Sequence, residues 1–197
     1  MGDVYFTIAK EGKGIFKEKM SKFLSFAIKV KSADEAKAVV KNYQNEYHDS
    51  RHVCWAYMLG PERKEWQLND NGEPSGTAGK PILGQINSFG LTDVVVVVVR
   101  YFGGIKLGTP GLIAAYREAA RLALEDAGKV EVHQMETIRI SFPYVSSNDV
   151  MKIVKSEEIE VLERIFDNSC EMTLSFRLDH SPRITSRLLS IAGLSLL

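Results

Sequence analysis

Six consecutive valines, Val94 to Val99, constrain the fold of this chain more than any other segment. β-Branched side chains favour extended backbone, so the run is predicted to be a strand. Because no position in it is polar, we expect the strand at the centre of a sheet, buried on both sides. The run is also far shorter than the roughly 20 apolar residues that span a bilayer, so we expect no membrane association.

Strands and helices on either side of the valine run predict a mixed α/β domain. Strands are expected at Val4–Ile8, Phe23–Val30, Val53–Leu59 and Glu65–Leu68, with a Gly/Lys-rich turn between the first two. Helices are expected over residues 33–46, from Pro81 to Gly90 and from Thr109 to Gly128. Ser32 and Thr109 are the predicted N-caps, and Pro81 and Pro110 the first helical residues.

The pattern restarts after a boundary near Val132–Glu136. The elements expected there follow the order β-α-β-β-α, at residues 137–144, 147–155, 160–166, 170–178 and 182–191. A turn at Asp167–Ser169 joins the last two full strands, and Leu194–Leu197 is a candidate final strand. The chain therefore predicts two domains, 1–133 and 134–197, the second a small α/β sandwich.

Charge and cysteine content exclude several classes of protein. The formal net charge is zero, which argues against an all-over basic nucleic-acid binder and leaves a local basic patch open. Cys54 and Cys170 lack a CxxC neighbour or a histidine at ligand spacing, so we expect buried thiols in a reducing cytosol and no metal site. The N-terminus lacks the apolar run of a signal peptide. We expect a cytoplasmic protein without cofactor.

Two glycine-rich loops were tested as nucleotide motifs. Gly79-Lys80 is not a P-loop, because Pro74 and Pro81 stand where that motif needs Gly and Ser or Thr. The segment 103–108 does not fit GxGxxG, since position 105 is Ile. No catalytic dyad or triad can be assembled from the sequence.

Arg100 and Lys106 flank the second glycine loop, which leads from the valine strand into the helix at Thr109. A helix N-terminus presents free N–H groups and a positive dipole end, so the loop is either a phosphate site or only a tight turn.

The loop 70–80 carries Glu73, Ser75, Thr77 and Lys80, and Pro74 and Pro81 stiffen its two flanks. Glycines and small hydroxyl residues suit a binding loop, and a surface loop closed by side-chain turns is the alternative.

The strand that starts near Arg51 carries an aromatic face that has two possible interpretations. Period-2 alternation places Trp55 on the same face as Arg51, and His52 on the opposite face. This aromatic face is either core or a base-stacking surface.

Three blocks of sequence together resemble the YigZ/IMPACT family: Ser50–Tyr57, Asp70–Gly79 and Val97–Thr109. The resemblance implies an α+β protein with two domains. The first would be a two-layer α/β domain similar to domain IV of elongation factor G, with helices on one face of a four- or five-stranded sheet. The second would be a ferredoxin-like domain similar to domain V of that factor. Pro110 departs from the family pattern, which has Gly there.

The family also carries functional expectations. Its eukaryotic relatives regulate translation by binding a scaffold of the amino-acid starvation response, and a nucleic-acid or ribosome role is suspected for the bacterial ones. No catalytic activity comes with the resemblance. Three hypotheses stay open: a non-enzymatic translation regulator that engages RNA, the ribosome or a translation partner, an enzyme acting on a phosphorylated small molecule or nucleotide, and a purely protein-binding stress regulator.

The candidate ligand or nucleic-acid contacts share a place in these blocks or at their ends: Arg51, His52, Trp55, Glu73, Ser75, Thr77, Lys80, Arg100, Tyr101, Lys106 and Thr109.

Overall fold

The computed structural model describes residues 3–167 and 170–197 and has a mixed α/β fold with antiparallel sheets. The chain divides into two compact units. Tyr5–Val132 forms the N-terminal unit, and His133–Leu197 forms the C-terminal unit together with Asp3 and Val4. The domain limits of 1–133 and 134–197 stay a prediction.

A five-stranded antiparallel sheet organises the N-terminal unit. Its strands lie in the order β2 (Gly12–Glu18), β3 (Ser21–Lys29), β6 (Val94–Tyr101), β4 (His52–Leu59) and β5 (Glu65–Asn69). The valine strand is central, and all six valines are 0% exposed. This confirms the prediction that both of its faces are buried.

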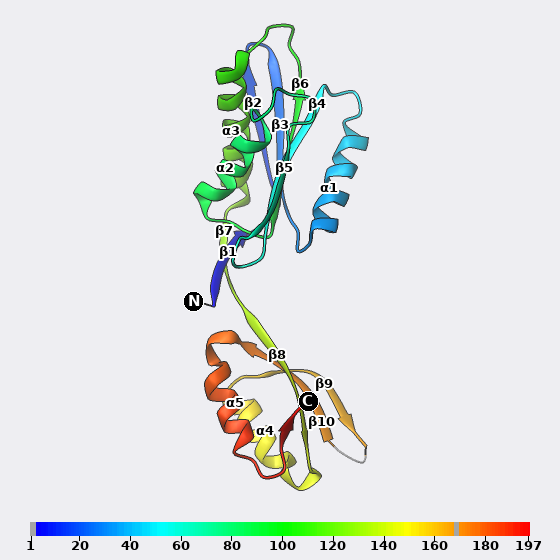
Figure 1. The fold of residues 1–197 in the computed structure, drawn as a ribbon, viewed down its shortest axis with the longest axis vertical. Helices are drawn as coiled ribbons and strands as arrows, with labels where there is room; N and C mark the ends of the chain where they lie inside the picture. Colours follow the sequence, from blue (N-terminus) through cyan, green and yellow to red (C-terminus); the bar gives the residue numbers. More distant parts are fainter. Residues whose placement is uncertain (1–2, 168–169) are drawn as a thin grey trace. The chain divides into compact units, whose positions relative to one another are not determined.

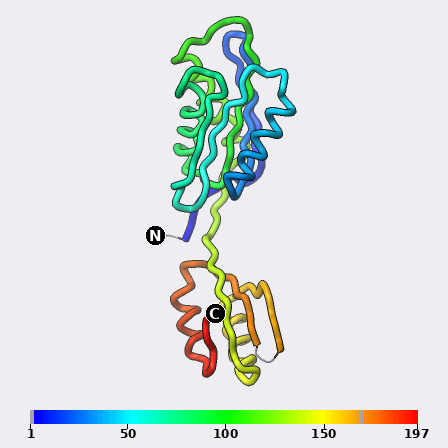
Figure 2. The backbone as a smooth tube through the Cα atoms, turned by 45° about the vertical axis from the view of Figure 1, so that its right-hand side comes forward, coloured from blue at the N-terminus to red at the C-terminus, as the bar shows by residue number. Residues whose placement is uncertain are grey.

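Helices cover both faces of this sheet (Figures 1 and 2). The odd-numbered valines pack in a core with α1 (Ala33–Glu46). The even-numbered valines pack in a second core with α2 (Gly79–Phe89) and α3 (Gly108–Ala127). The expectation of helices on one face only is therefore wrong. A valine run without a polar position would otherwise expose apolar side chains to water along one whole face.

The edge strand β2 replaces most of the predicted Gly/Lys-rich turn. Its glycines let it lie directly against α3: a Cβ on Gly12 would be 2.1 Å from the Ala123 carbonyl oxygen, and one on Gly14 would be 2.7 Å from the Leu122 Cβ. The sequence reading missed this strand because glycine usually weakens a strand, whereas here it permits close packing. A second strand not predicted, β7 (Lys129–His133), pairs with β1 (Val4–Ile8).

Helix starts differ from prediction at two of the three helices. Ser32 is the N-cap of α1 as predicted, and its Oγ accepts from the Glu35 N–H at 3.2 Å. The other two helices begin at Gly79 and Gly108, so Thr109 is not an N-cap and both prolines stand third in their helices. Proline is tolerated there because the first four N–H groups of a helix have no intrahelical acceptor.

The C-terminal unit packs two helices against one four-stranded sheet. Its elements are β8 (Met135–Phe142), the 3₁₀ turn η1 (Tyr144–Ser146), α4 (Ser147–Ser156), β9 (Glu160–Phe166), β10 (Cys170–Arg177), the 3₁₀ turn η2 (Leu178–His180), α5 (Ser181–Leu189) and β11 (Ser195–Leu196). The sheet order is β11-β8-β10-β9. The predicted element order is confirmed, including the short last strand. The predicted turn at Asp167–Ser169 includes residues 168 and 169, which lie outside the described residues.

Both cysteines are free and buried, as predicted, Cys54 in the N-terminal unit and Cys170 in the C-terminal unit. Over residues 3–167 and 170–197, no helix is long and apolar enough to cross a membrane.

Candidate functional site

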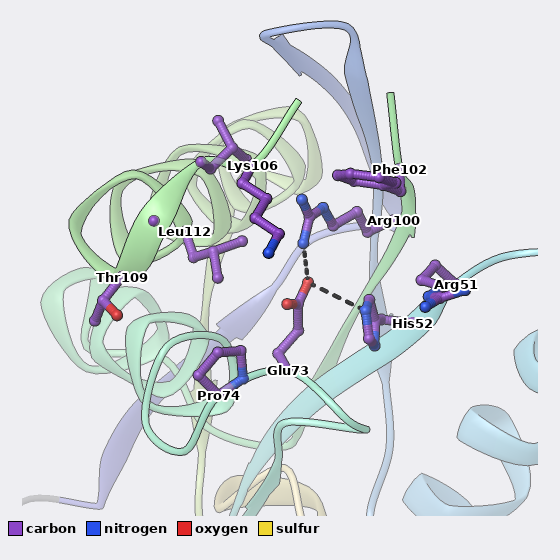
Figure 3. A pocket seen from close by; sticks show the side chains of 11 residues that line it. Arg51, His52, Glu73, Pro74, Arg100, Phe102, Lys106, Thr109 and Leu112 are labelled. Carbon is purple, nitrogen blue, oxygen red and sulfur yellow. Dashed lines mark hydrogen bonds and ion pairs between the residues drawn. The ribbon is translucent and has the colours of Figure 1, made fainter. Parts of the chain in front are cut away.

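A pocket of about 440 Å³ opens in the N-terminal unit, at the start of β4 and the end of β6. Its walls come from the start of β4, the loop before α2, and the loop between β6 and α3 (Figure 3). The lining residues are Arg51, His52, Glu73, Pro74, Arg100, Phe102, Lys106, Leu107, Gly108, Thr109 and Leu112. Its volume is within the range of about 300–1,000 Å³ that is typical of small-molecule sites.

The floor of the pocket is a buried ion pair between Arg100 and Glu73. Arg100 Nη1 lies 2.6 Å from Glu73 Oε1, and the two side chains are 6% and 3% exposed. The Tyr116 hydroxyl donates to the same carboxylate oxygen at 2.7 Å. The rings of Phe23 and Phe102 each lie 5.5 Å from the guanidinium carbon, so they limit its contact with water. Glu73 is therefore held in place by donors from β6 and α3.

His52 connects the pocket to the backbone of the 70–80 loop. Its Nδ1 lies 2.8 Å from the Asn71 carbonyl oxygen, which can only accept, so Nδ1 carries the proton. The other ring nitrogen, Nε2, is 3.8 Å from Glu73 Oε1 (Figure 3). The Asn71 side-chain oxygen accepts from the Val53 N–H at 2.8 Å. The loop is thus fixed to the start of β4.

Asp70 organises the 70–80 loop from within. Its carboxylate accepts from the N–H groups of Gly76 at 2.8 Å, Ala78 at 3.0 Å and Gly79 at 2.8 Å. A negative charge is favourable there, because these last two residues begin α2. Thr77 is 1% exposed and donates to the Pro74 carbonyl oxygen at 2.6 Å.

Of the predicted binding residues in this loop, therefore, some line the pocket and others do not. Glu73 lines the pocket, together with Pro74. The Thr77 hydroxyl makes a hydrogen bond that closes a turn within the loop. Ser75 and Lys80 are exposed but do not line the pocket. Most hydrogen bonds of the loop close turns through side chains, which agrees with the alternative of a surface loop closed by side-chain turns.

Trp55 and Tyr101 lie on the other side of the sheet. Trp55 is 8% exposed in the core beneath α1, and its ring stacks on Tyr57 with centroids 5.9 Å apart. Tyr101 packs against the same core and donates to Asp49 Oδ1 at 2.8 Å. Of the two alternatives stated for Trp55, the structure shows core and not a base-stacking surface, because α1 covers that face, so Trp55 is wrong as a candidate binding residue.

Six predicted residues do meet in the pocket: Arg51, His52, Glu73, Arg100, Lys106 and Thr109. Of its three cations, only Arg100 pairs with a carboxylate in the part of the chain that the structure describes. Once Glu73 has balanced Arg100, the pocket keeps two surplus positive charges, on Arg51 and Lys106.

The sequence reading missed Phe102 and Tyr116 as members of the site. Phe102 is 47% exposed at the pocket, and its place beside Arg100 and Tyr101 in a matched block was the available signal. Tyr116 lies within the helix expected from Thr109 to Gly128, and the available signal was that a buried tyrosine hydroxyl needs a hydrogen-bond partner.

Burial raises the pKa of two groups beneath the pocket, the Cys54 thiol and the Tyr116 hydroxyl, well above their ordinary values of 9.0 and 10.0. The Cys54 Sγ lies 3.3 Å from the Tyr116 oxygen, and the nearby Glu73 carboxylate raises both pKa values further.

These raised pKa values predict a loss of stability in alkali. Below the unfolded-state pKa values both states hold the protons, whereas above about pH 9 the unfolded chain releases protons that the folded chain keeps, so stability falls as pH rises. The urea midpoint of the N-terminal unit should be level from about pH 7 to 8 and fall progressively above about pH 9. Cys54→Ala should make the fall shallower. A midpoint that stays level or rises above pH 9 would contradict the assignment.

In residues 3–167 and 170–197 no cluster of three or more His, Cys, Asp or Glu side chains is arranged to hold a metal ion.

Comparison with known proteins gives matches over this unit and beyond it. The Impact N-terminal domain matches residues 19–124. YvyE of Bacillus subtilis (strain 168), described as an IMPACT family member, is 36% identical over 140 residues, which cover 71% of this chain and 64% of the relative. An IMPACT family member of Haemophilus influenzae is 33% identical over 167 residues, with 81% and 80% coverage. YigZ of Escherichia coli (strain K12) is 43% identical over 108 residues, with 54% and 53% coverage.

The matched segment thus spans about two thirds of YvyE and about half of YigZ. Among solved structures, a crystal structure of a hypothetical protein covers all of this chain with 98% of its own length, at a TM-score of 0.78 and 25% sequence identity.

Proposed function

Because this chain belongs to the IMPACT family, we propose that it is a non-enzymatic binding protein of translational control that engages RNA or the ribosome through the pocket above Glu73. One observation carries the proposal: an exposed aromatic ring, Phe102, lines the same pocket as two cations, Arg51 and Lys106, that pair with no carboxylate among the described residues, and the pocket is of nucleotide size. Aromatic faces stack bases and cations attract phosphates, the two interactions that proteins use for single-stranded nucleic acid.

A cavity of about 440 Å³ admits one nucleotide and not a duplex, so the proposal is for a single strand, a loop or an end. The chain as a whole has no net charge, so the attraction is local to the pocket.

The proposal extends to the family's expected architecture and location. In it, the N-terminal unit corresponds to domain IV of elongation factor G, and the C-terminal unit to its ferredoxin-like domain V. The sheet order β11-β8-β10-β9, built from elements in the order β-α-β-β-α-β, supports the second correspondence. The protein would act in the cytoplasm.

Salt dependence of RNA binding tests the proposal. The full chain should bind a single-stranded oligonucleotide, and its affinity should fall linearly with salt on a logarithmic plot, with a slope of about −0.7 per phosphate neutralised. Replacing Arg51 and Lys106 together by Ala should make the slope shallower by about 1.4, since two contacts are lost. The matched control is Lys41→Ala on α1, an exposed lysine away from the pocket, which should leave the slope unchanged.

Absence of RNA and ribosome binding, or binding that salt does not weaken, would reject the nucleic-acid form of the proposal. A purely protein-binding stress regulator would instead capture a partner that survives RNase treatment and is lost on Lys106→Glu. The enzyme alternative has less support from the site. Its two acidic groups, Asp70 and Glu73, already accept hydrogen bonds from backbone N–H groups and from Arg100 and Tyr116.

A further inference from the structure

We propose that the N-terminal turn of α3 is a subsite for a phosphomonoester, the terminal phosphate of a nucleotide whose base stacks on Phe102. The inference deepens the proposed function, on which the RNA source of that nucleotide rests. The chemistry is shared by a free nucleotide and by the end of an RNA strand, and the test below separates the two sources.

The first observation is that, among the described residues, no side chain accepts a hydrogen bond from the N-terminal N–H groups of α3. This helix has 20 residues, and Leu107 at its N-cap position makes no capping hydrogen bond. The next two residues, Gly108 and Thr109, line the pocket. By contrast, the N-terminus of α2 is already capped by the Asp70 carboxylate. Pro110 has no N–H, so the donors available in this turn of α3 are those of the residues beside it.

The second observation is independent of the helix and concerns Arg100. Its side chain is 6% exposed, and among the described residues its Nε has no hydrogen-bond partner. Leaving a buried donor unpaired costs about 1–3 kcal/mol, and more for a charged group, so such a donor calls for an acceptor. The side chains of Arg100 and Lys106 converge on the space above Glu73 (Figure 3). An oxyanion in that space would meet both.

Charge balance distinguishes a terminal phosphate from an internal one. Glu73 faces the same space and would repel an anion, but its charge is already matched by Arg100, and its Oε1 accepts from both Arg100 and Tyr116. The surplus is then two positive charges, on Arg51 and Lys106. A phosphomonoester carries about −1.5 to −2 at pH 7, whereas a phosphodiester in a strand carries about −1. The monoester is the better match.

Phe102 supplies the other half of the subsite. Its ring is 47% exposed and stands next to Arg100, 5.5 Å from the guanidinium carbon. One exposed aromatic face accepts one base, so the geometry indicates a single terminal nucleotide rather than a run of stacked bases.

Three oligonucleotides of one sequence, about ten nucleotides long, test the subsite with the full chain. They carry a 5′ phosphate, a 3′ phosphate or neither, with an internal fluorophore for anisotropy. We expect one terminal phosphate to raise affinity about tenfold, the effect of one additional charge-assisted hydrogen bond. Adenosine monophosphate should compete with that strand. Lys106→Gln should reduce the gain to about twofold or less, since it removes one of the two surplus charges, whereas Lys41→Gln should keep it.

The outcomes separate this inference from the proposed function. Equal affinity for all three strands would overturn the subsite and leave RNA binding standing. Calorimetric binding of adenosine monophosphate without RNA binding would overturn the RNA source and retain the subsite. A phosphate gain that persists in Lys106→Gln would overturn the assignment to this end of α3. Arg100→Gln is the direct test of the orphan donor, and the exposed Lys106 keeps the inference testable where that buried variant does not fold.

Discussion

Arg100→Met should destabilise the N-terminal unit by about 3–5 kcal/mol, the usual cost of removing one partner of a buried ion pair. The reason is local: Glu73, whose side chain is 3% exposed, would keep its charge without the guanidinium 2.6 Å away. Methionine replaces the aliphatic stem of arginine, so little cavity is added. Urea unfolding followed by tryptophan fluorescence measures the effect, since both tryptophans, Trp55 and Trp66, lie in this unit.

The double variant Arg100→Met/Glu73→Gln is the matched control. Glutamine keeps an oxygen for the Tyr116 hydroxyl and removes the stranded charge, so the double variant should recover about 2 kcal/mol relative to the single one. A loss below about 1 kcal/mol in the single variant would mean that the pair is screened like a surface pair, and the description of a closed pocket floor would be wrong.

Gly12→Ala and Gly84→Ala should change stability in opposite directions. A Cβ on Gly12 would lie 2.1 Å from the Ala123 carbonyl oxygen and 2.6 Å from the Ala127 nitrogen, both backbone atoms that cannot turn away. We expect a loss of about 3 kcal/mol or more, because β2 must move off α3. Gly84 lies in α2, where nothing is within 4 Å of an added Cβ, so alanine should stabilise by about 0.5–1 kcal/mol through helix propensity.

The same fluorescence-detected urea titration compares the two glycine variants. Because both are Gly→Ala changes within one unit, their effects on the unfolded chain are similar, and the difference between them reports on the folded packing. Two variants of equal stability would contradict the close contact of β2 with α3.

Much of the secondary structure could be predicted because its signals are local. The valine run specifies a strand through β-branching alone. Ser32 and Glu35, three positions apart, specify the start of α1 through an N-cap hydrogen bond. The first helical residues predicted at Pro81 and Pro110 were each misplaced by two residues, since proline is compatible with several positions of the first turn. β2 was missed because its glycines have meaning only against α3.

The candidate site likewise has residues that the sequence indicates and contacts that it does not. Arg100 and Glu73 were both named from the sequence, but their contact joins segments 27 residues apart, and no local pattern indicates it. The choice between core and stacking surface at Trp55 stayed open in the sequence, because strand alternation gives two faces without indicating what covers each of them.

The sequence by itself determined that β6 is buried on both faces, that a turn-rich loop begins at Asp70, and that Arg100 and Lys106 follow the valine run. Only the tertiary structure decided which of the candidate side chains meet in one pocket and which are buried or hydrogen-bonded away from it. The physical reason is that strand and helix formation depend on neighbours in the chain, whereas burial and charge pairing depend on which layer covers each face. Here α1 takes Trp55 into the core, and α3 brings Tyr116 to Glu73.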